Sequence, residues 1–284
     1  MPNFTDSSSS CSSPRFASAS YTTAFSSLGC PELEIDAVSA LARRYGITMI
    51  ELRALGGGTD LPAYFSARFG TPGELRVAAA DFGVPVAALG TSLRLIGNTE
   101  SDLIGFRTYI PWAQALGAPY LRVFDGGRTG DEEELEQAGE TLSWWMEESA
   151  ALDPPVDIIV ETHDSLAEPA ALEVFLARYP RCKLLWDTHH TWRRSGELPS
   201  RTWARVGEAV VHMHVKDSVA APDTRHGYRY VPLGSGEFPL SDLQDVLRHS
   251  RFSGVVSLEW ERLWHPALAP LESVLPDFRS LLAA

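Results

Sequence analysis

The feature that most constrains the fold of this 284-residue chain is the repeated alternation of two sequence patterns. Short apolar runs rich in β-branched residues indicate buried strands, and longer segments with helical periodicity follow them. The predicted strands are 16–24, 47–54, 84–92, 120–125, 157–163, 182–188, 210–216 and 254–260. Eight strands that alternate with helices predict either a closed (β/α)₈ barrel or an open, doubly wound parallel sheet.

Helices are predicted between these strands where charge and capping signals agree with the periodicity. Residues 34–45 carry acidic residues early and arginines late, which suits the helix dipole. Residues 131–151 begin with an acidic turn, and Ser241 is predicted to cap a helix over 240–250. Further helices are predicted over 100–117, 168–179 and 267–283.

The number of predicted strands favours the barrel over the open sheet. A dinucleotide-binding sheet should carry a GxGxxG motif after its first strand, whereas three consecutive glycines at 56–58 follow the second strand instead. No internal repeat or linker divides the chain, and α/β barrels of about 250 residues form one domain. We therefore expect a single-domain (β/α)₈ TIM barrel over 16–284, preceded by a disordered Ser-rich tail at 1–15.

Composition and charge exclude several classes of protein. The formal net charge of −13 disfavours nucleic-acid binding. Three cysteines without a CxxC pair form neither a disulfide framework nor a structural zinc site. No apolar run approaches the ~20 residues of a membrane span, and the N-terminal residues lack the apolar region of a secretory signal. We expect a cytoplasmic protein that binds neither membranes nor nucleic acids, and a homo-oligomer stays possible.

Side chains suited to metal binding concentrate where the last four predicted strands end. In a barrel these carboxyl ends form the active site, so one carboxylate or imidazole from each strand is expected to point inward. The four residues are Glu161, Asp187, His214 and Glu259. Three carboxylates and one imidazole suit one divalent metal ion, such as Mn²⁺, Mg²⁺, Co²⁺ or Zn²⁺. A cation would also relieve the repulsion between the carboxylates.

Neighbouring side chains are candidates for substrate contact. His212 and His214 share a strand face, and His214, nearer the carboxyl end, is the one expected to reach the metal. A single histidine at a strand end more often only hydrogen-bonds to backbone. Lys216, one of only two lysines, is predicted either to contact substrate oxygens or to form a surface pair with Asp217. Among the tryptophans, Trp264 is the one expected to touch the substrate.

The motifs VETHD, WDTHH, HMHVKD and SLEWE, with the LGSGE loop at 233–237, resemble those of the xylose-isomerase-like sugar isomerase/epimerase superfamily. The resemblance covers roughly 16–283 and is most specific from 157 to 261. It implies a (β/α)₈ barrel with one catalytic divalent metal held by the four residues above, and a substrate-contacting histidine at His190. In ketose 3-epimerases of this group, the two metal-bound glutamates also transfer the proton.

The expected function is therefore a metal-dependent isomerase or epimerase. It would move a proton next to the carbonyl of a small sugar or polyol-like substrate through an enediolate. Glu161 and Glu259 are the expected catalytic residues, and the expected substrate contacts are His163, His190, Lys216 and Trp264.

Three alternatives are left open. An inosose-type dehydratase, which is a lyase, would use the same metal site. An endonuclease IV-like DNA repair enzyme is less favoured, because its three zinc ions need histidines after the second and third strands and no histidine precedes His163. A non-catalytic barrel is less favoured because candidate ligands stand at all four strand ends.

Overall fold

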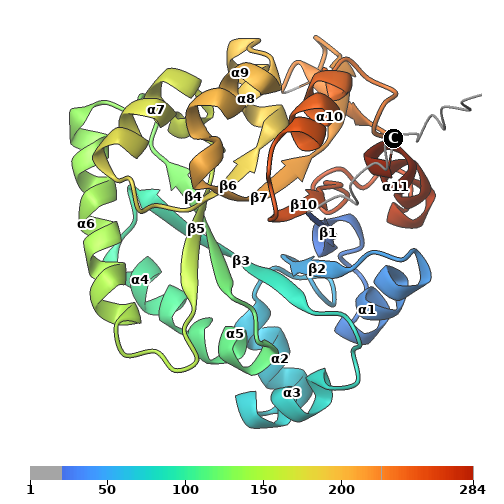
Figure 1. Cartoon of the computed structure of the whole chain (residues 1–284). Helices are drawn as coiled ribbons and strands as arrows, with labels where there is room; N and C mark the ends of the chain where they lie inside the picture. The colour runs from blue at the N-terminus through green and yellow to red at the C-terminus, as the bar shows by residue number, and fades with distance from the viewer. Residues whose placement is uncertain (1–20, 225, 284) are drawn as a thin grey trace, which may run out of the picture.

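A computed structural model of the chain describes residues 21–224 and 226–283. Within them, eight parallel strands close into a barrel in the order β1-β10-β7-β6-β5-β4-β3-β2, with helices outside it (Figure 1). The barrel strands are β1 (Thr22–Ser26), β2 (Met49–Leu52), β3 (Val86–Ile96), β4 (Tyr120–Gly126), β5 (Asp157–Glu161), β6 (Leu184–Asp187), β7 (Val210–Val215) and β10 (Val255–Leu258). The predicted (β/α)₈ barrel is confirmed. The predicted tail at 1–15 and the start of the first predicted strand lie outside the described residues.

The helices lie in the connections between the strands, except for the last helix, which follows the last strand. They are α1 (Ile35–Arg44), α2 (Leu61–Phe69), α3 (Pro72–Ala79), α4 (Glu100–Arg107), α5 (Ile110–Leu116), α6 (Glu132–Ser149), α7 (Pro169–Arg178), α8 (Thr188–Ser195), α9 (Pro199–Val206), α10 (Leu240–His249) and α11 (Leu275–Ala283). Short 3-10 helices are η1 (Ser27–Gly29), η2 (Ser165–Ala167), η3 (Gly207–Ala209) and η4 (Leu271–Ser273). None of the described helices is long and apolar enough to cross a membrane.

Local polar motifs determine where several helices begin. Thr71 and Glu74 form a reciprocal capping box at the start of α3. The side chain of Asp131 caps α6, whose first turn is acidic as predicted. The predicted cap at Ser241 is wrong: the N-cap of α10 is Pro239, which makes no side-chain cap hydrogen bond. Leu240 is buried as the first helical residue, so Ser241 already lies inside the helix.

The core lies both between the barrel and its helices and inside the barrel. A large apolar cluster joins the outward faces of the strands to the helices. A smaller cluster of Ala88, Ile159 and Leu185 is separate from it. Because side chains alternate along a strand, Glu161 and Asp187 lie on the same faces as Ile159 and Leu185, one step nearer the carboxyl ends. The small cluster thus supports the base of the candidate site.

A two-stranded antiparallel hairpin, β8 (Asp217–Ala220) with β9 (Tyr228–Val231), stands apart from the barrel sheet. The buried carboxylate of Asp217 accepts hydrogen bonds from the backbone N–H of Gly234 at 3.0 Å and of Gly236 at 2.8 Å. A Cβ at Gly236 would lie 2.1 Å from Asp217 Oδ1. The LGSGE loop therefore needs this glycine to close on Asp217.

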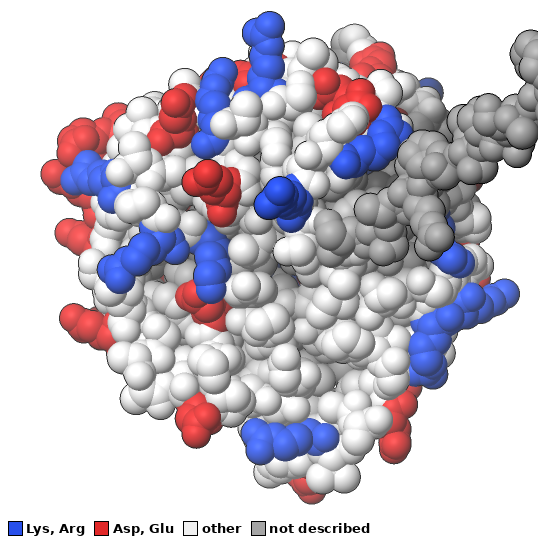
Figure 2. All heavy atoms as spheres, viewed as in Figure 1, with Lys and Arg blue, Asp and Glu red and all other residues white. Residues whose placement is uncertain are grey.

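Charged side chains of both signs are mixed over the surface. On the face shown in Figure 2, Lys and Arg side chains lie among Asp and Glu side chains rather than in one continuous basic area. Together with the formal net charge of −13, this face offers no basic track for a phosphate backbone.

Candidate metal centre

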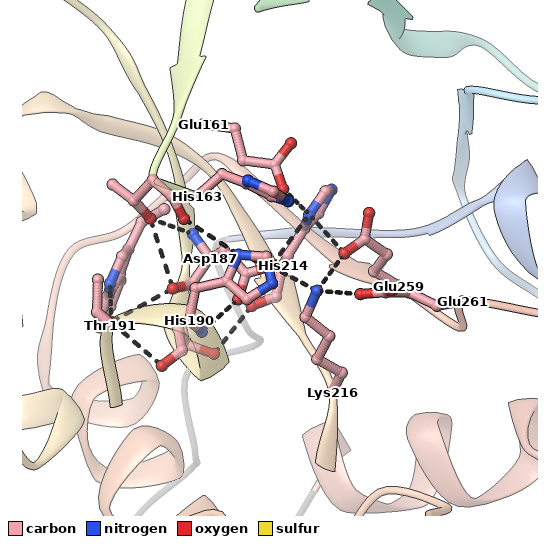
Figure 3. Close-up of polar contacts among 12 residues, drawn as sticks. Glu161, His163, Asp187, His190, Thr191, His214, Lys216, Glu259 and Glu261 are labelled. Carbon is pink, nitrogen blue, oxygen red and sulfur yellow. Dashed lines mark hydrogen bonds and ion pairs between the residues drawn. The ribbon is translucent and has the colours of Figure 1, made fainter. Parts of the chain in front are cut away.

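The four predicted metal ligands come together at the carboxyl ends of four adjacent strands. Glu161 and Asp187 end β5 and β6, His214 lies in β7, and Glu259 directly follows β10. All four residues are at most 5% exposed. One ligand atom from each lies within 4.8 Å of the others. Figure 3 shows their polar ends turned toward one another.

The distances within this cluster fit a single metal ion. His214 Nδ1 lies 3.5 Å from Glu161 Oε1, 3.7 Å from Asp187 Oδ2 and 3.4 Å from Glu259 Oε2. Two ligands that each lie about 2.1 Å from one metal ion are separated by roughly 3–4 Å. Nδ1 is also buried without a hydrogen-bond partner among the described residues. The donor set therefore fits a divalent cation.

The opposite nitrogen of His214 determines which tautomer faces the cluster. Its Nε2 lies 2.9 Å from Glu51 Oε2, a fully buried carboxylate in β2. An ionised carboxylate only accepts hydrogen bonds, so Nε2 carries a proton, and in the neutral form of the ring the Nδ1 lone pair points toward the cluster. Burial opposes a second proton, but the charges of Glu259 and Glu51 raise the pKa of His214 well above its ordinary value. Protons and a metal ion would thus compete for Nδ1.

Glu51 is the main residue that the sequence analysis did not select. Its Oε2 also lies 3.2 Å from His212 Nε2 and accepts a hydrogen bond from Ser257 Oγ at 3.0 Å. Burial would raise the pKa of Glu51, but His214 and His212 hold it below its ordinary value. The sequence did contain one sign of this role, namely a glutamate within the apolar run 47–54. Only barrel closure shows that it faces β7.

We expect Glu51→Gln to weaken metal binding about 10–100-fold while the barrel stays folded. Glutamine keeps the shape but no longer stabilises the Nε2–H tautomer of His214 with a charge. Calorimetric titration of chelator-treated protein with Zn²⁺ and with Mn²⁺ measures the effect. Ser257→Ala is the matched control, because it removes another contact of Glu51 without changing charge. Equal affinities for Glu51→Gln and the wild type would contradict this role.

Lys216 is a buried cation within the same cluster (Figure 3). Its Nζ lies 2.8 Å from Asp187 Oδ2, 2.5 Å from Glu259 Oε2 and 2.7 Å from Glu261 Oε1. Burial opposes its charge, but these carboxylates raise the pKa of Lys216 well above its ordinary value. The predicted alternative of a surface pair with Asp217 is wrong, because strand alternation turns Asp217 away toward the LGSGE loop. A substrate contact by Lys216 stays a prediction.

Asp187 is positioned by the helix that follows it. Its Oδ1 accepts a hydrogen bond from the backbone N–H of His190 at 2.8 Å and so caps α8. The other oxygen is left facing His214 and Lys216. One residue thus both begins the helix and directs a carboxylate into the cluster.

The two remaining candidate histidines lie at the open edge of the cluster. The rings of His163 and His190 are perpendicular, with centres 4.8 Å apart, and both line a cavity of about 550 Å³. Burial opposes protonation of His163, but its hydrogen bond to Asp164 raises its pKa to about 9. Trp264 is 55% exposed, in the loop after β10. Substrate contact by these three residues stays a prediction.

A family model described as a xylose isomerase-like TIM barrel matches residues 39–277. The chain belongs to this family. A search by sequence alone found no curated protein that matches.

Several solved structures share the fold. The probable 3-DHS dehydratase AsbF from Bacillus anthracis is 17% identical, over 93% of this chain and 99% of that chain, with a TM-score of 0.73. The IolI protein, solved with a binding zinc atom, is 18% identical over 92% and 96%, with a TM-score of 0.71. The 3-keto-D-glucoside 4-epimerase YcjR from E. coli is 15% identical over 93% and 100%, with a TM-score of 0.68. At such identities the likeness shows the fold alone.

Proposed function

We propose that this protein is a metal-dependent isomerase or epimerase acting on a small sugar-like or polyol-like hydroxy-carbonyl compound. The observation that carries the proposal is the buried set of three carboxylates and one imidazole at the mouth of the barrel. Glu161, Asp187, His214 and Glu259 would hold the metal ion. Mn²⁺, Mg²⁺, Co²⁺ and Zn²⁺ all accept such ligands.

The proton transfer is assigned to the two glutamates. A bound divalent cation would polarise the substrate carbonyl and lower the barrier to loss of the neighbouring proton. Glu161 and Glu259 come from the two outer strands of the four, so they can approach a substrate from different sides. One carboxylate removes the proton to form an enediolate and the other returns a proton. Burial would raise the pKa of Glu259, but His214 and Lys216 hold it well below its ordinary value, which keeps this group ionised.

A turnover screen in D₂O tests the proposal. Protein supplemented with each candidate metal is incubated with aldoses, ketoses, their phosphate esters, inosose and hydroxypyruvate, and NMR follows exchange at the carbon next to the carbonyl. We expect metal-dependent exchange and an isomeric product for at least one of these compounds, and neither exchange nor product after chelation. We also expect no incision of abasic-site duplex DNA. Robust metal-dependent incision would replace the isomerase proposal with a repair function.

A dehydratase is the second candidate, because it begins with the same proton removal but then expels a β-hydroxyl group. The observation that favours it is the pairing of His163 with Asp164 at 3.1 Å beside the cavity. An imidazolium stabilised in this way could donate the proton that the leaving hydroxyl needs. A dehydratase would yield an unsaturated carbonyl product with ultraviolet absorbance and no isomer, so product analysis separates the two candidates.

A further inference from the structure

Two buried arginines lie side by side on the inner side of the barrel. Arg122 belongs to β4 and Arg53 follows β2, and they are 1% and 6% exposed. Gly90 of β3 lies between them. A Cβ at Gly90 would approach Arg53 Cδ to 2.7 Å and Arg122 Nη2 to 2.9 Å. A side chain at this position of β3 would collide with the stem of Arg53 and the guanidinium group of Arg122, so the glycine leaves the room that both arginine side chains occupy.

The charges of these two arginines are balanced differently. Arg122 Nε lies 3.1 Å from Glu161 Oε2, and Arg122 Nη1 donates to the carbonyl oxygen of Thr91 at 2.9 Å. Among residues 21–224 and 226–283, no ion pair joins Arg53 to a carboxylate. Within the described part of the chain, the guanidinium group of Arg53 donates only to the carbonyl oxygen of Thr59 at 3.5 Å and to Ser92 Oγ at 3.3 Å. Both contacts are longer than usual hydrogen bonds of about 2.7–3.2 Å.

A buried cation without a counter-ion is unfavourable for the folded chain. Burial, with the adjacent charge of Arg122, lowers the pKa of Arg53 to about 10, so the guanidinium stays charged at neutral pH. The more distant charges of Glu161 and Glu259 offset part of this effect. Arg53 is therefore within electrostatic range of both proposed catalytic carboxylates and still lacks a direct anionic partner.

We propose that Arg53 and Arg122 bind an oxyanion of the substrate, a carboxylate or a phosphate ester. The proposal rests on the proposed function only in calling the bound molecule a substrate. Planar guanidinium groups pair with such oxyanions through parallel hydrogen bonds, and the anion would supply the charge that Arg53 lacks. The substrate class then narrows from neutral sugars to hydroxy-carbonyl acids or sugar phosphates.

A second group of arginines provides a competing location. Arg128, Arg193 and Arg194 line the cavity beside His190. Arg128 and Arg194 are exposed, and Arg193 already contacts Ser218. Exposed guanidinium groups are solvated, so they do not demand an anion in the way that Arg53 does. Arg194→Met is therefore the matched control for Arg53→Met.

Binding of three small probes tests the proposal without any need for turnover. Mn²⁺-supplemented protein is titrated calorimetrically with glycerate, glycerol 3-phosphate and glycerol. We expect one or both anions, but not glycerol, to bind the wild type, and Arg53→Met to weaken that binding roughly 10–100-fold. Arg194→Met should bind as the wild type does. Binding by glycerate alone identifies a carboxylate, and binding by glycerol 3-phosphate alone identifies a phosphate ester.

Several outcomes would overturn the proposal. The wild type could bind no anion, or Arg53→Met could bind the anions as tightly as the wild type does. The loss of anion binding could also be confined to Arg194→Met. Competition by a short single-stranded DNA, lost in Arg53→Met, would assign the two arginines to a nucleic-acid backbone instead. A failed turnover screen would refute the proposed function while leaving these binding results intact, so the two failures are distinguishable.

Thermal unfolding separates a binding role from a structural one. Methionine replaces the buried, unpaired charge of Arg53 with an apolar side chain, so the Tm of Arg53→Met should be at or above that of the wild type. Arg122→Met should lower the Tm, because Glu161 loses its buried partner. If Arg53→Met lowers the Tm as much as Arg122→Met does, Arg53 is a structural residue and the proposal fails.

Discussion

Replacement of Glu161 or Glu259 by glutamine is expected to lower kcat about 10²–10⁴-fold even when the metal is saturating. Glutamine keeps the shape and an oxygen ligand, so part of the metal affinity should remain. It removes the basic carboxylate, so proton transfer should fail. The measurement uses a substrate deuterated next to its carbonyl, whose label the wild type should exchange with solvent and neither variant should exchange at a comparable rate.

Glu261→Gln is the matched control for these two variants. Glu261 also contacts Lys216, at 2.7 Å, but it is not among the four proposed ligands. Its variant should retain kcat within a few-fold. If a metal-loaded glutamine variant at Glu161 or Glu259 still exchanges the label at close to the wild-type rate, that glutamate is only a ligand. The base must then be sought among His163, His190 and Lys216.

Removal of a proposed ligand is expected to abolish most metal binding. Purified protein should contain close to one divalent ion per chain, and His214→Ala and Asp187→Ala should lose most of it, as measured by plasma mass spectrometry. Each variant loses one of only four ligands. Circular dichroism should show that the barrel still folds.

Asp187 needs a further variant because it also caps α8. Asp187→Asn keeps a good capping residue and removes the negative charge, so it should separate the loss of the cap, about 1 kcal/mol, from the loss of the ligand. His249→Ala, at the end of α10, is the control for histidine removal away from the cluster. Full metal retention by both His214→Ala and Asp187→Ala would refute the ligand assignment.

Local sequence patterns were sufficient to predict the barrel because apolar periodicity is a local property of each strand. The run 120–125 became β4 and the run 157–163 became β5 with little change at their starts. The ends of the strands depended on tertiary pairing: β3 continues to Ile96 because, beyond a shift in register, Arg94 and Ile96 still pair with Phe124 and Gly126 of β4. The hairpin β8–β9 was missed because its strands have only four residues each and have no apolar run of their own.

The convergence of Glu161, Asp187, His214 and Glu259 could also be predicted, since the carboxyl ends of parallel strands meet at one mouth in any such barrel. Only the closure of the barrel and the register of its strands decided which charged side chains face one another inside it. Glu51 lies far from His214 in the chain and reaches it across the interior. Whether a buried charge such as that of Arg53 has a partner depends on side chains from other strands. Alternation along a strand shows which way a residue points, but only the assembled barrel determines what it meets there.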